Sequence, residues 1–381
     1  MKQTHRLLSL LLALALLCSL LPTAAFAVEV EPEEAAAQVQ EDNAAAPEEE
    51  TTETPEEEIE EVLAEVPAEE EIADETVAEA PMQEGEPTSY GLWVGNVKVT
   101  SANQDEIRED ESSPVLGSYD PDTYTLTLTD AVIPTTNGTY RGLIDFVCYD
   151  DDVTLTVTGS AVLGGEGCGS IGIWVTGCNL AVNGTGDGIR YTGSRYGIYS
   201  FRSRSQSNHP RTGGSLTLLG TISVSSSSLD AILSDGEMTV KDGANLTATT
   251  ASTSFAGLHS RYGPLSIEGG TVYAEGGNGI EVYYEREDTD RITISGGNVT
   301  AISKGDSQIV DKKGCGIYAW NGITLSGGTI TARSESTGAS YGLNAYTGGI
   351  DVQNGVTKVT AQAGLAILAY IDPLTIGNQL P

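Results

Sequence analysis

A three-part phrase that recurs along the chain restricts its fold more than any other feature. The clearest copy reads GIYAW at 316–320, GITLSGG at 322–328 and TITA at 329–332. Three such short strands are not stable alone, but stacked copies can pair strand on strand at about 4.8 Å. The repeat therefore predicts an all-β chain with a right-handed parallel β-helix over residues 136–381. Further copies start 22–37 residues apart, at Gly142, Gly172, Gly197, Ala231, Gly257, Gly279, Gly342 and Ala366.

The first strand of each repeat predicts which side chains form the core. The residue after the start position is aliphatic, and the residue two further on is small or Val. Alternate residues of a strand point to the same side, so we expect both columns to line the interior. The Gly-Gly pairs fit corners where the backbone takes a positive φ. The two columns are Ile198, Ile232, Leu258, Ile280, Ile317, Leu343 and Ile367, and Ser200, Ser234, Ser260, Val282, Ala319, Ala345 and Ala369.

Three different regions precede the repeat. Residues 1–27 have the form of a secretory signal peptide, with a basic start, an apolar run and a small-residue cleavage site. Residues 28–89 hold 24 Asp plus Glu and no Lys or Arg, which predicts a disordered acidic linker. Residues 90–135 contain alternating strand segments that we expect to form a β cap on the open end of the solenoid. The sequence thus predicts a secreted, extracellular protein and leaves cell-surface attachment open.

Charge and cysteine usage exclude several classes of partner. From Tyr90 onward the chain has 30 acidic and 17 basic residues, a net charge of −13. A nucleic acid requires a basic face, so we expect no nucleic-acid binding.

The apolar run of the signal region is too short to favour a permanent membrane span. No zinc-type Cys spacing is present, so we expect no structural metal and no cofactor, while a role for Ca²⁺ stays open. Four cysteines follow the signal region, and their spacing leaves the disulfide pairing open: Cys148, Cys168, Cys178 and Cys315. Cys168 and Cys178 are the closest pair in sequence.

Several of these segments resemble a family of repetitive bacterial surface proteins described as carbohydrate-binding-domain-containing. The resemblance covers residues 90–371 and rests on LWVGNVKVTSAN at 92–103, YDPDTYTLTL at 119–128 and the ITISGG-type rungs. A signal peptide followed by an acidic spacer is also typical of that family. The resemblance implies an extracellular location and binding of glycans or adhesion. It supplies no agreed binding residues.

The outward positions of the first strand supply the candidate binding residues. Aromatic rings stack on the C–H faces of sugars, and polar neighbours can bond the hydroxyl groups. If successive rungs are in register, the aromatic side chains form one outer ladder, which either binds glycans or only stabilises the stack. The ladder consists of Tyr199, Phe201, Tyr283, Tyr318, Trp320, Tyr346 and Tyr370, interrupted by Asp235 and Arg261, with His259, Glu281 and Asn344 as polar neighbours.

Two other functions remain as alternatives to glycan binding. A β-helix polysaccharide lyase or glycoside hydrolase needs carboxylates placed around the sugar, and the best local supply is the acidic stretch 281–290. That stretch has the pattern of an insertion, and no catalytic residue is assigned. A purely structural surface rod is the third class. The oligomeric state and the identity of the glycan stay open.

Overall fold

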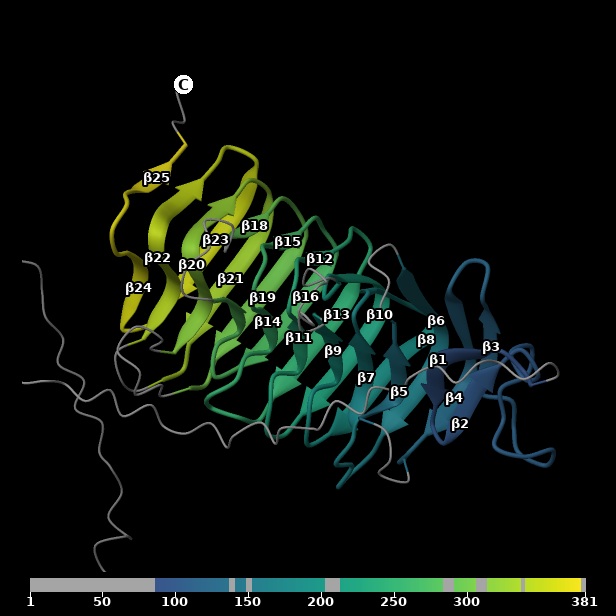
Figure 1. Ribbon diagram of the computed structural model, residues 1–381. Helices are drawn as coiled ribbons and strands as arrows, with labels where there is room; N and C mark the ends of the chain where they lie inside the picture. The colour runs from purple at the N-terminus through teal and green to yellow at the C-terminus, as the bar shows by residue number, and fades with distance from the viewer. Residues whose placement is uncertain are drawn as a thin grey trace, which may run out of the picture. The chain divides into compact units, whose positions relative to one another are not determined.

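The computed structural model describes residues 86–136, 141–148, 153–202, 213–283, 291–305, 314–336 and 340–377. The predicted signal peptide and residues 28–85 of the predicted linker lie outside these ranges. The described residues form a parallel β-solenoid of about eight turns and contain no helix (Figure 1). The fold class predicted from the repeat is therefore confirmed.

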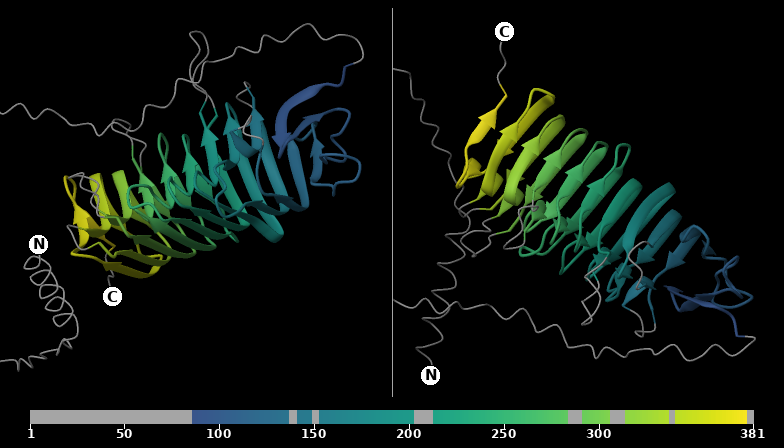
Figure 2. Two further views of the ribbon diagram at one scale, coloured as in Figure 1. Left: turned by 90° about the horizontal axis from the view of Figure 1, so that it is seen from below. Right: turned by 45° about the horizontal axis from the view of Figure 1, so that its top comes forward.

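Each turn contributes strands to three faces, and the strands of a face stack in chain order from the N-terminal to the C-terminal end (Figure 2). The first face is the one formed by the opening strand of each repeat. Its strands are β5 (Gly142–Val147), β7 (Ile171–Thr176), β9 (Ile198–Phe201), β11 (Ile232–Ser234), β14 (Leu258–Ser260), β17 (Ile280–Val282), β20 (Cys315–Leu325), β22 (Tyr341–Val352) and β24 (Leu365–Ala369).

The second and third faces are formed in part by long strands that pass a corner without a break. For example, one end of β10 pairs with β12 on the second face, and its other end pairs with β13 on the third. The long strands are β6 (Thr154–Gly164), β8 (Asn179–Gly193) and β10 (Leu216–Ser226); β20 and β22 extend from the first face onto the second in the same way. The remaining strands are β12 (Met238–Val240), β15 (Leu265–Ile267), β18 (Ile292–Ile294) and β25 (Leu374–Ile376) on the second face, and β13 (Asn245–Thr250), β16 (Thr271–Gly276), β19 (Asn298–Ser303), β21 (Gly328–Ser334) and β23 (Val356–Gln362) on the third.

Two antiparallel pairs precede the regular turns. They are formed by β1 (Ser89–Val94) with β2 (Val97–Thr100), and by β3 (Gly117–Asp120) with β4 (Thr125–Ile133). β1 also pairs antiparallel with β5, so it covers the open edge of the first face. β4, however, pairs in parallel with β6 and already belongs to the stack. The parallel stacking therefore begins with β4, within the segment 90–135 that the sequence assigns to the cap.

The predicted inward columns form the core. Ile198, Ile232 and Leu258 are in direct register, and the alignment continues through Ile280, Ile317, Leu343 and Ile367. All of them except Ile367 are fully buried, and so is the small column from Ser200 to Ala345. The three serines of that column donate hydrogen bonds to backbone carbonyl groups at the corner between the first and second faces, on their own or the preceding turn, which satisfies their hydroxyls inside the solenoid.

The Gly-Gly corners also behave as the sequence predicts. Gly297 has φ of +85°, and a Cβ there would lie 2.5 Å from the carbonyl oxygen of Gly270 on the preceding turn. Only glycine meets both conditions. The disulfide pairing left open by the sequence is Cys148–Cys178, with Cα atoms 6.0 Å apart. Cys168 and Cys315 are buried outside this bond.

Candidate functional site

The outer side of the first face carries two columns of side chains. The middle column occupies the central outward position of each strand, and its members align in register across the turns. The strand-end column lies two residues further along each strand. The middle column is Trp93, Asp145, Trp174, Tyr199, Leu233, His259, Glu281, Tyr318, Asn344 and Leu368, and the strand-end column is Phe201, Asp235, Arg261, Tyr283, Trp320, Tyr346 and Tyr370.

Most of the middle column is buried although it points away from the core. Tyr199, Glu281, Tyr318 and Asn344 are at most 5% exposed. They therefore face outward as predicted, but other side chains cover them and leave little of their surface to a ligand. Strand alternation gives the direction of a side chain relative to its sheet, but it does not show what packs over it. Here strand-end residues pack on the column: the rings of Tyr283 and Tyr318 lie 6.0 Å apart.

The strand-end column is held in place by a repeated backbone contact. The amide of Asp235 donates to the carbonyl of Ser200 at 3.0 Å, and the amide of Arg261 donates to Ser234 at 2.8 Å. The same bond links Tyr283 to Ser260 and Tyr370 to Ala345. Each strand-end side chain therefore starts from an equivalent position on its turn. These side chains reach solvent to different degrees, from Asp235, which is 2% exposed, to Tyr370, which is 65% exposed.

The aromatic rings at the C-terminal end of this column stack on one another. The centroids of Trp320 and Tyr346 are 4.3 Å apart with the planes at 21°, and those of Tyr346 and Tyr370 are 5.4 Å apart at 7°. Near-parallel rings at these distances cover each other's faces. Tyr346 therefore presents an edge, not a face, to a ligand. Tyr283 differs, because its ring meets Trp320 at 77° and forms a corner.

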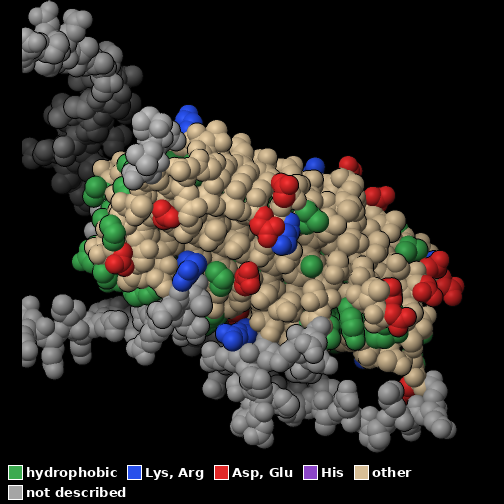
Figure 3. All heavy atoms as spheres, turned by 90° about the horizontal axis from the view of Figure 1, so that it is seen from above, with side chains coloured by type: hydrophobic (Ala, Val, Ile, Leu, Met, Phe, Trp, Pro, Cys, Tyr) green, Lys and Arg blue, Asp and Glu red, His purple; other side chains and the backbone are tan. Residues whose placement is uncertain are grey.

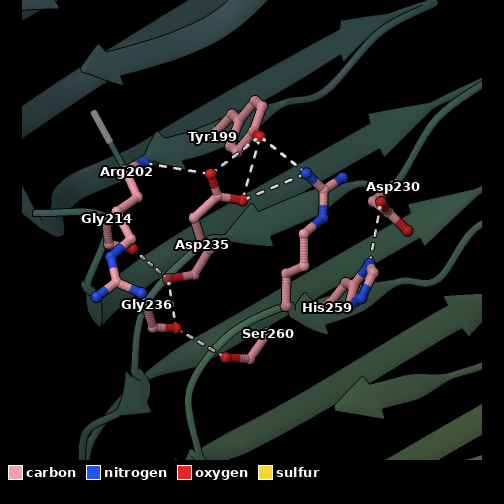
Figure 4. Close-up of polar contacts among 10 residues, drawn as sticks. Tyr199, Arg202, Gly214, Asp230, Asp235, Gly236, His259 and Ser260 are labelled. Atoms are coloured by element: carbon pink, nitrogen blue, oxygen red, sulfur yellow. Dashed lines mark hydrogen bonds and ion pairs between the residues drawn. The ribbon is translucent and has the colours of Figure 1, made fainter. Parts of the chain in front are cut away.

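A polar network interrupts the aromatic column on two consecutive turns (Figure 4). The carboxylate of Asp235 accepts hydrogen bonds from the hydroxyl of Tyr199 at 3.2 Å and from the amide of Arg202 at 3.2 Å. The guanidinium of Arg261 lies 3.5 Å from Asp235 and 3.4 Å from the hydroxyl of Tyr199. Asp235 is 2% exposed, whereas the Arg261 side chain is 26% exposed. Burial raises the pKa of the Asp235 carboxyl, although the charge of Arg261 opposes the shift.

His259 and Asp230 form a second pair beside this network. Nδ1 of His259 lies 3.3 Å from the carboxylate of Asp230, which also accepts a hydrogen bond from the amide of Ala256 at 2.6 Å. Nε2 of His259 is buried and has no hydrogen-bond partner among the described residues. Burial lowers the pKa of this imidazole, but the charges of Asp230 and Glu281 outweigh it, and the net shift is upward.

Glu281 continues the polar column on the next turn. Its carboxylate accepts a hydrogen bond from Nδ2 of Asn278 at 2.8 Å, and Oδ1 of Asn278 accepts the amide of Cys315 at 2.7 Å. Nδ2 of Asn344 lies 3.6 Å from Sγ of Cys315. Burial raises the pKa of the Cys315 thiol, which makes it a structural rather than a nucleophilic group.

The N-terminal half of the first face has its own aromatic cluster. Trp174 packs edge-on against Tyr199 and stacks on Phe201 with centroids 5.5 Å apart. The guanidinium of Arg141 lies 5.1 Å from the Trp174 ring centroid. Asp145, in register with Trp174, accepts the amide of Arg141 through one oxygen, while Oδ1 has no partner among the described residues. Burial raises the pKa of Asp145.

The structure thus brings together two groups of predicted residues and adds several that the sequence did not assign. Phe201 and Tyr199 belong to the N-terminal group, and Tyr283, Tyr318, Trp320, Tyr346 and Tyr370 belong to the C-terminal one. Asp235 and Arg261 lie between them and were visible in the sequence only as interruptions. Asp230 and Asn278 precede their strands, outside the alternating positions. Of the acidic stretch 281–290, residues 284–290 lie outside the described ranges.

No protein-family model, curated protein or solved structure matches the chain. Within the described part of the chain, no three His, Cys, Asp or Glu side chains lie close enough together to hold a metal ion. No helix among the described residues is long and apolar enough to span a membrane.

Proposed function

We propose that the protein is a secreted, extracellular binder of saccharides and that the sugar contacts the first face around Arg261. The single observation that carries this proposal is the polar interruption of the aromatic column. Asp235 and Arg261 occupy consecutive turns between Phe201 and Tyr283, at about 4.8 Å per turn. Oriented polar groups between aromatic walls are what a saccharide site requires, because a sugar has hydroxyl edges and apolar faces.

Arg261 is the group best placed to meet a ligand. Its contacts with Asp235 and the Tyr199 hydroxyl fix the orientation of the guanidinium, while a quarter of the side chain remains exposed. A pre-oriented guanidinium can donate two parallel hydrogen bonds to neighbouring sugar hydroxyls with little further loss of entropy.

The charge of the protein favours saccharides that are not anionic. The sequence carries a net charge of −35, and the acidic side chains of Asp230 and Asp235 pair with the basic groups of this patch. The side of the molecule seen from above Figure 1 is mostly uncharged side chains and backbone, with scattered charged side chains and a group of acidic ones at one end (Figure 3). An anionic polymer gains no general attraction from such a surface.

The buried acids do not support hydrolysis or elimination as the function. Asp230 and Asp235 are each 2% exposed, and Nε2 of His259 is buried. A general acid or base must come within hydrogen-bond reach of the substrate. A structural rod is the second candidate, favoured by the mutual stacking of Trp320, Tyr346 and Tyr370.

A glycan array probed with the purified full chain tests the proposal, followed by titration calorimetry on the saccharides that bind. Arg261→Lys keeps the charge but loses the planar fork, so affinity is expected to fall about tenfold. Arg333→Lys is the matched control, because Arg333 lies on the third face in a surface ion pair with Glu335. An array without any bound saccharide, or equal affinities for the two variants, contradicts the proposal.

A further inference from the structure

The last described turn of the solenoid leaves the core open. β23, β24 and β25 each pair with a strand of the preceding turn, and with no strand on their other side among the described residues. Ile367 and Leu374 continue core columns whose preceding members, Leu343 and Ile350, are at most 1% exposed. On the last turn these columns open into a groove of about 440 Å³ with a mostly apolar lining. Five large apolar side chains of this turn are 41–66% exposed: Leu365, Tyr370, Ile371, Leu374 and Ile376.

This end surface, residues 353–377, has the size and composition of a protein interface. Its 25 residues lie within the about 20–30 that each partner contributes to a standard interface. It contains one basic and one acidic side chain, Lys358 and Asp372, in a chain of net charge −35. Depletion of charged residues is what distinguishes the centre of an interface from other surface. The three unpaired strand edges around it can each accept a further strand.

The opposite end of the solenoid does not present a matching surface. β1 pairs antiparallel with β5 and covers the edge of the first face, and β3 covers the part of β4 that belongs to the second face. These strands lie at the far end of the solenoid from β24 and β25 (Figure 1). Head-to-tail stacking, which would give open filaments, therefore lacks its second surface. The end surface of another copy, in contrast, offers both free strand edges and an apolar centre.

We propose that two copies of the chain associate through their end surfaces, about a two-fold axis that passes through Ile367 and is perpendicular to the solenoid. This axis places β24 antiparallel to β24 of the other copy, and it places β23 beside β25 of the other copy. β24 reads LAILA and carries no charge, so its two copies do not repel each other. The same surface of each copy is used, so the association closes at two copies.

The charged side chains near the end surface favour this axis. Lys358 on β23 points outward, and so does Asp351, which is in register with Thr375 of β25. The axis brings the third face of one copy beside the second face of the other, so Lys358 of each copy lies near Asp351 of the other. An axis through β23 would instead bring the two Lys358 side chains together, which is unfavourable.

The proposed axis also determines where the two first faces lie. Because it passes through β24, the first faces of both copies are on the same side of the dimer. Arg261 is four turns from β24, so the two Arg261 side chains are nine turn spacings, or about 43 Å, apart. The dimer therefore presents its two candidate sites in the same direction.

Sedimentation equilibrium of the purified full chain tests the proposal. Two copies per particle are expected at about 100 µM protein, with a dissociation constant in about the micromolar range. Ile376→Lys changes a side chain that is 66% exposed in the single copy, and it is expected to weaken the dimer at least about tenfold. Ile371→Lys, at the corner before β25, is a second variant with the same expectation. Val162→Lys is the matched control, because Val162 is 47% exposed on β6, away from the end surface, and it should leave the dissociation constant unchanged.

A charge exchange tests the axis itself. Lys358→Asp is expected to weaken the dimer about threefold, and Asp351→Lys in the same chain is expected to restore it. A double variant that associates no more tightly than Lys358→Asp alone overturns the proposed axis. A chain that remains a single copy at about 100 µM, or a mass that keeps rising beyond two copies with concentration, overturns the proposal. Folded Ile376→Lys and Ile371→Lys chains that both keep the wild-type dissociation constant overturn it as well.

Discussion

Replacement of Arg261 by Gln isolates the energetic role of the polar interruption. The substitution leaves the Asp235 carboxyl buried with the Tyr199 hydroxyl and the Arg202 amide as remaining partners. Removing one member of a fully buried ion pair costs about 3–5 kcal/mol. Because the Arg261 side chain is 26% exposed and water already screens the pair, we expect about 2–3 kcal/mol. For a domain of this size, that lowers the melting temperature by about 4–12 °C.

The loss should depend on pH with a definite sign. Burial already holds the pKa of Asp235 above its ordinary value, and loss of Arg261 raises it further. The folded state then binds a proton that the unfolded state releases, so stability falls as pH rises from the unfolded pKa through the folded one. The deficit of Arg261→Gln should therefore grow as the pH rises from the folded-state pKa of Asp235 in the wild type to the higher folded-state pKa in the variant. Asp235→Asn removes the titrating group, and the double variant should recover at least half of the loss.

Calorimetric melting of the wild type, both single variants and the double variant measures this cycle. If Arg261→Gln lowers the free energy of unfolding by less than about 0.5 kcal/mol, the range of ordinary surface substitutions, then Arg261 does not stabilise the buried Asp235 carboxylate. A deficit that shrinks with rising pH would contradict this role as well, because the buried carboxyl would then not be the cause.

Three further predictions concern the rest of the molecule. Burial raises the pKa of Asp145 and Asp235, and the charges of Asp230 and Glu281 raise the pKa of His259. The wild-type melting temperature should therefore fall as the pH rises from about 5 to about 8. A melting temperature that rises over this range contradicts these shifts. Tyr346→Ala removes two stacking contacts and should cost about 1–3 kcal/mol, whereas Tyr370→Ala removes one from a ring that is 65% exposed and should cost under about 1 kcal/mol; the reverse order in denaturant melts would argue against the stack. Cys148→Ser with Cys178→Ser should cost about 2–4 kcal/mol and speed amide exchange in β5 and β7; unchanged exchange there would mean that the disulfide stabilises other turns.

The sequence predicted the solenoid because its repeat is also its spatial unit. Two neighbouring residues of the core column, such as Ile280 and Ile317, are 37 positions apart in the sequence but pair directly. Equivalent positions of successive repeats therefore lie beside one another on successive turns. The same relation accounts for the disulfide, which proximity in sequence alone did not identify. Cys168 is closer to Cys178 in sequence, but Cys148 lies one turn away, where vertical neighbours are found.

The candidate site was predicted only in part, for a physical reason. Alternation identified Tyr199, Tyr318 and Asn344 as outward, which is correct relative to the sheet. It did not reveal that strand-end rings and residues before each strand cover them. Asp230 and Asn278 act from such preceding positions, where the repeat has no regular pattern. Their role follows only from contacts between turns.

The fluorescence of Trp320 tests directly whether a saccharide binds on the first face. The chain has three tryptophans, so Trp93→Phe with Trp174→Phe leaves Trp320 as the only one, in the half-buried strand-end column. Titration with a saccharide that binds by calorimetry should shift the Trp320 emission and protect it from acrylamide quenching, with the same dissociation constant. A saccharide that binds with full affinity while the emission and quenching of Trp320 stay unchanged would place the ligand elsewhere and contradict binding on the first face.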